Sequence, residues 1–122
     1  MTPLVLVVDN EKGLLTLFSS LVQRMGYQVL QAESGLAALG ILEEQTPDLL
    51  VLDLAMPEMT GFDVLQEVIT MPHLDTMPVM VLTATSFGPA PDDVAHRIGA
   101  WVTKPVHPDA FYAAVRELLE GA

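Results

Sequence analysis

The stretch Leu49-Leu50-Val51-Leu52-Asp53-Leu54-Ala55-Met56-Pro57 joins an apolar run to an aspartate and a turn. A strand without polar alternation is typical of a parallel sheet covered on both faces. We predict four further strands of the same kind, at residues 4–8, 27–30, 79–82 and 101–103. The apolar pattern therefore predicts a parallel sheet of five strands.

Amphipathic segments lie between and after these strands. We predict helices at residues 13–25, 34–44, 62–70, 91–98 and 108–120, with Ser34 as the N-cap of the second. Strands that alternate with helices predict an α/β, doubly wound (βα)5 fold. Nothing in the pattern marks a linker, so we expect a single domain over residues 1–122.

Composition excludes several classes of protein. The 122 residues contain five Lys plus Arg, sixteen Asp plus Glu and no Cys, giving a net charge of −11. This charge argues against direct binding to nucleic acid or to an anionic membrane. The uncharged stretch at residues 76–91 contains three prolines and is shorter than the roughly 20 apolar residues of a membrane span. With no basic segment typical of a signal peptide at its start, the chain is expected to be cytoplasmic.

Polar residues follow four of the five predicted strands. They are Asp9-Asn10-Glu11, Asp53, Thr83-Ala84 and Lys104-Pro105. Taken singly, each has an ordinary interpretation: Asn10 as a helix cap, Asp53 as a turn residue, Thr83 as a loop hydroxyl, Lys104 as a solvated lysine. Because parallel strands all end at one edge of the sheet, these groups are predicted to lie together, and ligands bind at that edge.

The chemistry of this set points to phosphoryl transfer. Carboxylates that crowd together raise each other's pKa unless a cation lies between them. Mg²⁺ suits a site with few oxygen ligands and several waters. Mg²⁺ and Lys104 would neutralise phosphoryl oxygens while Asp53 attacks as the nucleophile.

With these residues in view, the sequence resembles the receiver domain of bacterial two-component response regulators. The resemblance runs from the first strand to the last helix and rests on Asp9-Asn10-Glu11, Asp53 with Met56-Pro57 and Gly61-Phe62, Thr83-Ala84 and Lys104-Pro105. It implies a flavodoxin-like sandwich with strand order 2-1-3-4-5, the order that a chemotaxis protein exemplifies for this fold.

The resemblance also implies a role for each site residue. Asp53 would be the phosphoacceptor. Mg²⁺ would be bound by Asp53, by Asn10, by the backbone carbonyl of Ala55 and, through water, by Asp9. The protein would be a phosphoacceptor signalling domain, not an enzyme, catalysing only its own phosphorylation and dephosphorylation.

A second group of residues would bind and sense the phosphoryl group. Lys104 would bind a phosphoryl oxygen, Thr83 and Ala84 would move toward it, and Trp101 would be the switching aromatic. The Lys104–Pro105 peptide bond would be cis. Trp101 has an alternative interpretation as a fixed packing residue.

Three features depart from the family pattern. Position 10 is Asn where the family usually has an acid, which predicts weaker Mg²⁺ binding. Trp101 is larger than the usual Tyr or Phe. The proline-rich residues 86–91 predict a short or displaced fourth helix, which bears on the family's usual dimer and output face.

The implied partners are a sensor histidine kinase or phosphotransfer protein and a downstream protein or output domain. No output domain is expected within these residues, and we expect a monomer or a weak dimer formed on phosphorylation. The rival hypothesis is a non-phosphorylated pseudo-receiver that acts as a protein-interaction module. A flavin carrier is disfavoured because residues 9–11 would repel the flavin phosphate.

Overall fold

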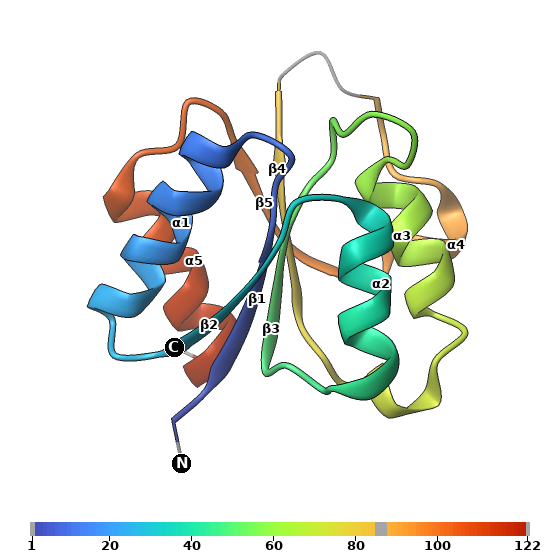
Figure 1. The fold of residues 1–122 in the computed structure, drawn as a ribbon, viewed down its shortest axis with the longest axis horizontal. Coiled ribbons are helices and arrows are strands. Elements are labelled where there is room, and N and C mark those ends of the chain that lie inside the picture. The colour runs from blue at the N-terminus through green and yellow to red at the C-terminus, as the bar shows by residue number, and fades with distance from the viewer. Residues whose placement is uncertain (1, 85–87, 122) are drawn as a thin grey trace.

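The computed structural model describes residues 2–84 and 88–121. The elements in chain order are β1 (Leu4–Val8), α1 (Lys12–Arg24), β2 (Gln28–Ala32), α2 (Gly35–Glu44), β3 (Leu49–Asp53), α3 (Gly61–Val68), the 3-10 turn η1 (Pro72–Leu74), β4 (Val79–Thr83), α4 (Asp92–Ala95), β5 (Ile98–Thr103) and α5 (Pro108–Glu120). Figure 1 shows their alternation along the chain.

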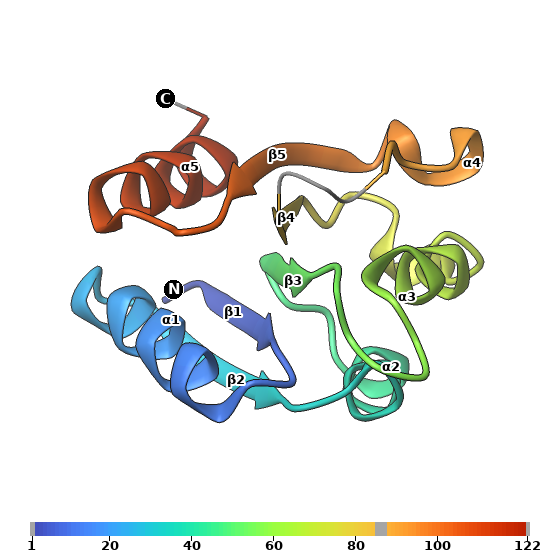
Figure 2. The same cartoon turned by 90° about the horizontal axis from the view of Figure 1, so that it is seen from above.

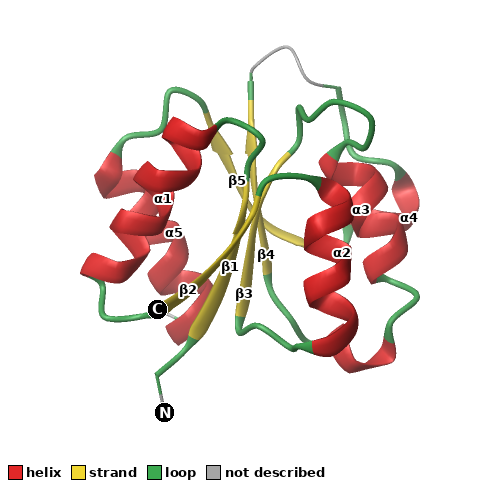
Figure 3. Ribbon diagram, viewed as in Figure 1, coloured by secondary structure: helices red, strands yellow, loops and turns green. Residues whose placement is uncertain are grey.

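The five strands form one parallel sheet in the order β2-β1-β3-β4-β5. Seen from above, α1 and α5 cover one face and α2, α3 and α4 the other (Figure 2). Figure 3 shows the same three layers by type of element. The predicted fold class and strand order are therefore confirmed.

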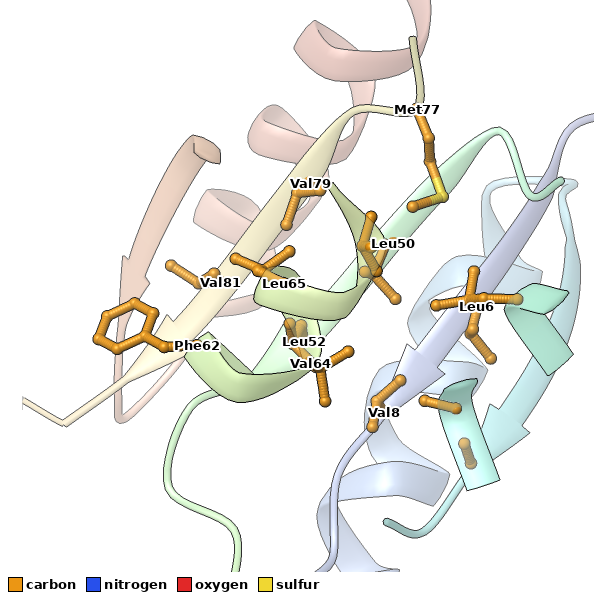
Figure 4. Packing of buried hydrophobic residues seen from close by; sticks show 14 of the residues in the cluster. Leu6, Val8, Leu50, Leu52, Phe62, Val64, Leu65, Met77, Val79 and Val81 are labelled. Atoms are coloured by element: carbon orange, nitrogen blue, oxygen red, sulfur yellow. The ribbon is translucent and has the colours of Figure 1, made fainter. Parts of the chain in front are cut away.

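The three inner strands are buried because apolar side chains cover both of their faces. Every residue of β3 and β4 is buried, and β1 is buried from its second residue on. One apolar cluster lies under α2 and α3 and includes Leu6, Leu50 and Val81 (Figure 4). A second lies under α1 and α5, where Phe18 stacks on Phe111 with ring centroids 5.5 Å apart. This double burial explains the missing polar alternation in the sequence.

The helix starts confirm the predicted Ser34 cap and contradict the ordinary interpretation of Asn10 as a helix cap. The Ser34 hydroxyl accepts a hydrogen bond from the Ala37 amide at 3.1 Å, as expected of an N-cap. Asn10 does not cap α1: the N-cap position is Glu11, which makes no side-chain capping bond. The carboxylate of Asp9 instead accepts from the Glu11 amide at 2.9 Å, so the turn before α1 is held by the preceding residue.

The region around the fourth helix differs from its predicted boundaries. α4 is a single turn of four residues, which confirms a short helix, but β5 begins at Ile98 where we predicted that the helix would still run. Ile98 and Ala100 pair with β4 across a register shift between Val79 and Met80. The Arg97 guanidinium donates hydrogen bonds to the Leu74 carbonyl, at the end of η1, at 2.6 Å and to the Met77 carbonyl, just before β4, at 3.3 Å. Pairing with β4 thus starts the strand three residues before the predicted position 101. Ser86 and Phe87, which belong to the proline-rich stretch 86–91, lie outside the described residues.

Other boundaries move by one to three residues. β2 runs from Gln28 to Ala32, later than predicted, and α3 ends at Val68, earlier than predicted. α5 has the predicted bounds. In the described part of the chain no helix is long and apolar enough to cross a bilayer.

Candidate functional site

The carboxyl edge of the sheet gathers four of the predicted side chains. Asp9 follows β1, Asp53 and Thr83 are the last residues of β3 and β4, and Lys104 follows β5. These strand ends lie together at the upper side of the sheet in Figure 1. The Lys104 amide donates to the Thr83 carbonyl at 2.8 Å, so the β4–β5 ladder continues as far as the lysine and fixes where its side chain starts.

Two buried carboxylates share one lysine at this edge. The Lys104 Nζ lies 3.0 Å from Asp53 Oδ1 and 3.7 Å from Asp9 Oδ2. Asp9 and Asp53 are 0% and 2% exposed, whereas the Lys104 side chain retains 26% of its exposure. The pair of carboxylates is therefore withdrawn from water, and the lysine approaches it from the solvent side.

Burial dominates the electrostatics of Asp53. Burial raises the pKa of the Asp53 carboxyl above its ordinary value, and the Asp9 carboxylate raises it further. The hydrogen bond and charge of Lys104 and the backbone amide of Ala55 lower this pKa without cancelling the effect of burial. One lysine does not compensate two buried carboxylates.

The oxygen Asp9 Oδ2 is buried and has no hydrogen-bond partner in the structure. Its ion-pair partner, Lys104 Nζ, lies 3.7 Å away and is shared with Asp53. Buried polar atoms are nearly always hydrogen-bonded, so this oxygen has capacity to bind a further cation. Within residues 2–84 and 88–121 no cluster of three or more His, Cys, Asp or Glu side chains could hold a metal. The donors available are two carboxylates, the exposed Asn10 amide and the Ala55 carbonyl. Mg²⁺ fits this set because it retains several waters and accepts few protein oxygens.

Of the predicted switch residues, Thr83 and Ala84 lie at the end of β4 and Trp101 lies within β5. The Thr83 hydroxyl donates to the Ala84 carbonyl at 2.9 Å and makes no hydrogen bond to Asp53. Trp101 pairs with Val81 in the sheet register, is 46% exposed, and lies edge-on to Phe62 with ring centroids 6.2 Å apart. The structure thus brings Thr83 and Ala84 to the site and leaves Trp101 on the outer strand.

Two further features adjoin the site. The Lys104–Pro105 peptide bond is cis. Beside it lies an apolar groove of about 470 Å³ formed by α1 and the β5–α5 connection and lined by Leu14, Leu17, Phe18, Lys104, Pro105 and Val106. Leu17 is 45% exposed there. In α1, Phe18 and Leu21 next to it along the helix are buried, so exposure distinguishes Leu17 from these core residues.

Sequence reasoning also gave no role to Gly61, the first residue of α3. A Cβ at this position would lie 2.7 Å from the Asp53 carbonyl oxygen. The sequence did contain a signal: Thr60 caps α3, and a glycine directly after a cap, at a position where other residues form helix better, indicates a packing reason for the glycine.

Comparison with known proteins agrees with this geometry. Residues 5–116 match the response regulator receiver domain family. The chain is 39% identical over 118 residues to the transcriptional regulatory protein GlrR of Escherichia coli K12, covering 94% of this chain and 26% of GlrR, so it spans about a quarter of that relative. It is 30% identical over 125 residues to the polar-differentiation response regulator DivK of Brucella ovis, covering 100% of both chains.

Solved structures show the same architecture. The chemotaxis response regulator CheY4 of Vibrio cholerae superposes with a TM-score of 0.85 and 26% identity, covering 98% of this chain and 100% of CheY4. The receiver domain of a histidine kinase from Syntrophus aciditrophicus gives a TM-score of 0.83 and 25% identity, covering 99% and 92%. The fold and site thus define a flavodoxin-like signalling domain. The chain belongs to the response regulator receiver domain family of two-component systems.

Proposed function

We propose that this receiver domain accepts a phosphoryl group on Asp53 in an Mg²⁺-dependent reaction. The observation that carries the proposal is the buried Asp53 carboxylate, held 3.0 Å from Lys104 Nζ, together with the buried Asp9 Oδ2, which accepts no hydrogen bond and pairs only at 3.7 Å with the same lysine among the described residues. A nucleophilic carboxylate beside a fixed cation and a second carboxylate matches the demands of phosphoryl transfer.

Each residue has a defined part in this reaction. An oxygen of Asp53 forms a bond to phosphorus as the phosphorus–nitrogen bond of a phosphohistidine donor breaks. Lys104 offers its ammonium group to the phosphoryl oxygens and keeps Asp53 ionised. Asp9, Asp53, Asn10 and the Ala55 carbonyl would hold Mg²⁺, which supplies positive charge to the phosphoryl oxygens when bound.

The test is the intact mass of the protein after incubation with acetyl phosphate, with Mg²⁺ or with a chelator. We expect a single phosphoryl increment that requires Mg²⁺. The rival hypothesis of a pseudo-receiver is suggested by Asn10 and by the single-turn α4. A pseudo-receiver would gain no mass under either condition. That result would replace the proposal with the rival function.

Asn10 is expected to weaken Mg²⁺ binding, because an amide oxygen carries no formal charge. Replacing it with Asp should tighten Mg²⁺ about fivefold, as expected for one added charge in a solvated position. The same change should lower the stability of the metal-free protein through repulsion with Asp9 and Asp53. Isothermal titration measures the affinity, with Gln28→Glu, an added charge at the opposite end of the sheet, as control. An unchanged or weaker affinity in Asn10→Asp would contradict the prediction.

We further propose that the phosphodonor protein docks in the apolar groove between α1 and the β5–α5 connection. The groove contains Lys104 itself, so a partner seated there reaches the phosphoacceptor. Leu17 is a large apolar side chain left half-exposed in this groove, and exposed apolar patches mark interaction sites.

A charge in this groove should separate docking from chemistry. With a histidine kinase that phosphorylates the wild type, Leu17→Glu should slow phosphotransfer about tenfold or more. Labelling by acetyl phosphate should be unchanged, because the small donor needs no docking surface. The matched control is Leu36→Glu on α2, where a leucine is 68% exposed on the other face of the sheet. Equal effects of the two substitutions on phosphotransfer would rule out this groove.

The conformational response is proposed to begin at Thr83. Among the described residues its hydroxyl bonds to the neighbouring Ala84 carbonyl, and it could turn to a phosphoryl oxygen on Asp53. The exposed indole of Trp101 would then bury more of its surface toward the space that Thr83 leaves.

A further inference from the structure

The connection from β3 to α3 carries the Ala55 carbonyl and is closed at its base by backbone contacts. The Leu54 amide donates to the Leu82 carbonyl at 3.0 Å, and the Gly61 amide donates to the Leu54 carbonyl at 3.1 Å. Residues 55–60 therefore leave the sheet and return to it at the same point. The Thr60–Asp63 capping box fixes the start of α3 directly after this return.

The closed loop contains a strained turn. The Met59 amide donates to the Pro57 carbonyl at 2.7 Å, and Glu58 between them has a φ of 68°. A γ-turn with positive φ is rare and unfavourable for a residue with a side chain. Such a conformation persists only where the surroundings impose it, so the anchors of the loop determine its shape.

Gly61 anchors the end of the loop directly against the backbone of Asp53 and Leu54. A Cβ there would lie 2.7 Å from the Asp53 carbonyl oxygen, 2.8 Å from Leu54 Cδ2 and 3.1 Å from Leu54 Cα. Two of these neighbours are backbone atoms of the strand end that bears the phosphoacceptor. The φ of Gly61 is not in the positive region, so the glycine serves close approach and not an unusual backbone conformation.

The loop also contacts α2 through the flexible side chain of Met59. A Cβ at Gly35, the first residue of α2, would lie 2.7 Å from Met59 Sδ and 2.8 Å from its Cγ. A methionine side chain can move aside at small cost. Gly40, also in α2, has no neighbour within 4 Å of such a Cβ. An added methyl group would thus meet backbone atoms at Gly61, a flexible side chain at Gly35 and nothing at Gly40. The three glycines form a graded series for testing the loop.

We infer that Gly61 is a positioning residue for the cation, because its lack of a side chain sets where the Ala55 carbonyl lies relative to Asp53. The inference rests on the proposed Mg²⁺-dependent function. An added methyl group must separate the start of α3 from the Asp53–Leu54 backbone. The loop between them then shifts, and a ligand oxygen on it shifts too, while Asp9 and Asp53 stay in the sheet.

The test is the Mg²⁺ dissociation constant, measured by isothermal titration on the wild type and three alanine variants. Gly61→Ala should weaken Mg²⁺ about tenfold or more, the range found when groups that orient metal ligands are changed. Gly35→Ala should weaken it less, by about twofold, and Gly40→Ala should leave it unchanged. All titrations are made at 10 °C in trimethylamine N-oxide, which favours the folded state, and circular dichroism establishes that each chain is folded.

The outcomes separate the inference from the function on which it rests. A wild type that binds no Mg²⁺ would refute the proposed function itself. A wild type that binds and a folded Gly61→Ala that binds equally well would refute only the role of Gly61. A Gly61→Ala chain that stays unfolded in the osmolyte would make the glycine a requirement of folding, and would also overturn the inference.

Discussion

Asn in place of Asp53 is expected to abolish the gain of phosphoryl mass from acetyl phosphate. The amide keeps the size and position of the side chain but has no anionic oxygen with which to attack phosphorus. Intact mass spectrometry of wild type and Asp53→Asn, each with Mg²⁺, makes the comparison. Asp109→Asn in the first turn of α5, where the carboxylate is exposed, is the matched control and should label like the wild type.

Equal labelling of Asp53→Asn and wild type would place the acceptor elsewhere. The substitution should also stabilise the metal-free protein toward urea at pH 7. Burial raises the Asp53 pKa, which means that the folded state holds the charged form at a cost. Removing that charge removes the cost, so a loss of activity should come together with a gain of stability.

Methionine in place of Lys104 is expected to lower the free energy of unfolding by about 3 kcal/mol at pH 7, the scale for removing one partner of a buried ion pair. The ammonium is 3.0 Å from Asp53 and 3.7 Å from Asp9, so its loss leaves two buried carboxylates without compensation. Urea unfolding without Mg²⁺ measures the effect. Lys12→Met is the control, because Lys12 is 85% exposed and 3.8 Å from Glu33, and it should cost less than about 1 kcal/mol.

The same variant should show a pH dependence of defined sign. Lys104 lowers the Asp53 pKa, so its removal raises further a pKa that burial already raises. The folded variant then takes up a proton at a higher pH than the unfolded chain does. Its stability should increase as pH falls from 7 through the raised pKa of the folded state toward the ordinary value, and the difference from wild type should shrink. A difference that is constant with pH would show that Lys104 does not act through Asp53.

The sequence alone determined the architecture and the chemical character of the edge. Apolar runs without alternation indicated a doubly covered parallel sheet, since local hydrophobic patterning records which faces are buried. The parallel direction then placed Asp9, Asp53, Thr83 and Lys104 at one edge, because the ends of parallel strands coincide whatever the loops between them do. Local signals also gave the Ser34 cap and the shortness of α4.

Only the tertiary structure decided how these groups meet. Asp9 rather than Asn10 holds the turn before α1, and one oxygen of Asp9 accepts no hydrogen bond within the described residues. Both facts depend on how β1 packs beside β3 and on where Lys104 reaches. The start of β5 was likewise set by pairing with β4 and by Arg97, not by the helical pattern of residues 91–98. The role of Gly61 follows from the lack of space for a side chain there: a Cβ would lie 2.7 Å from the backbone oxygen of Asp53, eight positions earlier. Such contacts join segments whose spacing depends on the packing of the whole core, so no local pattern in the sequence contains them.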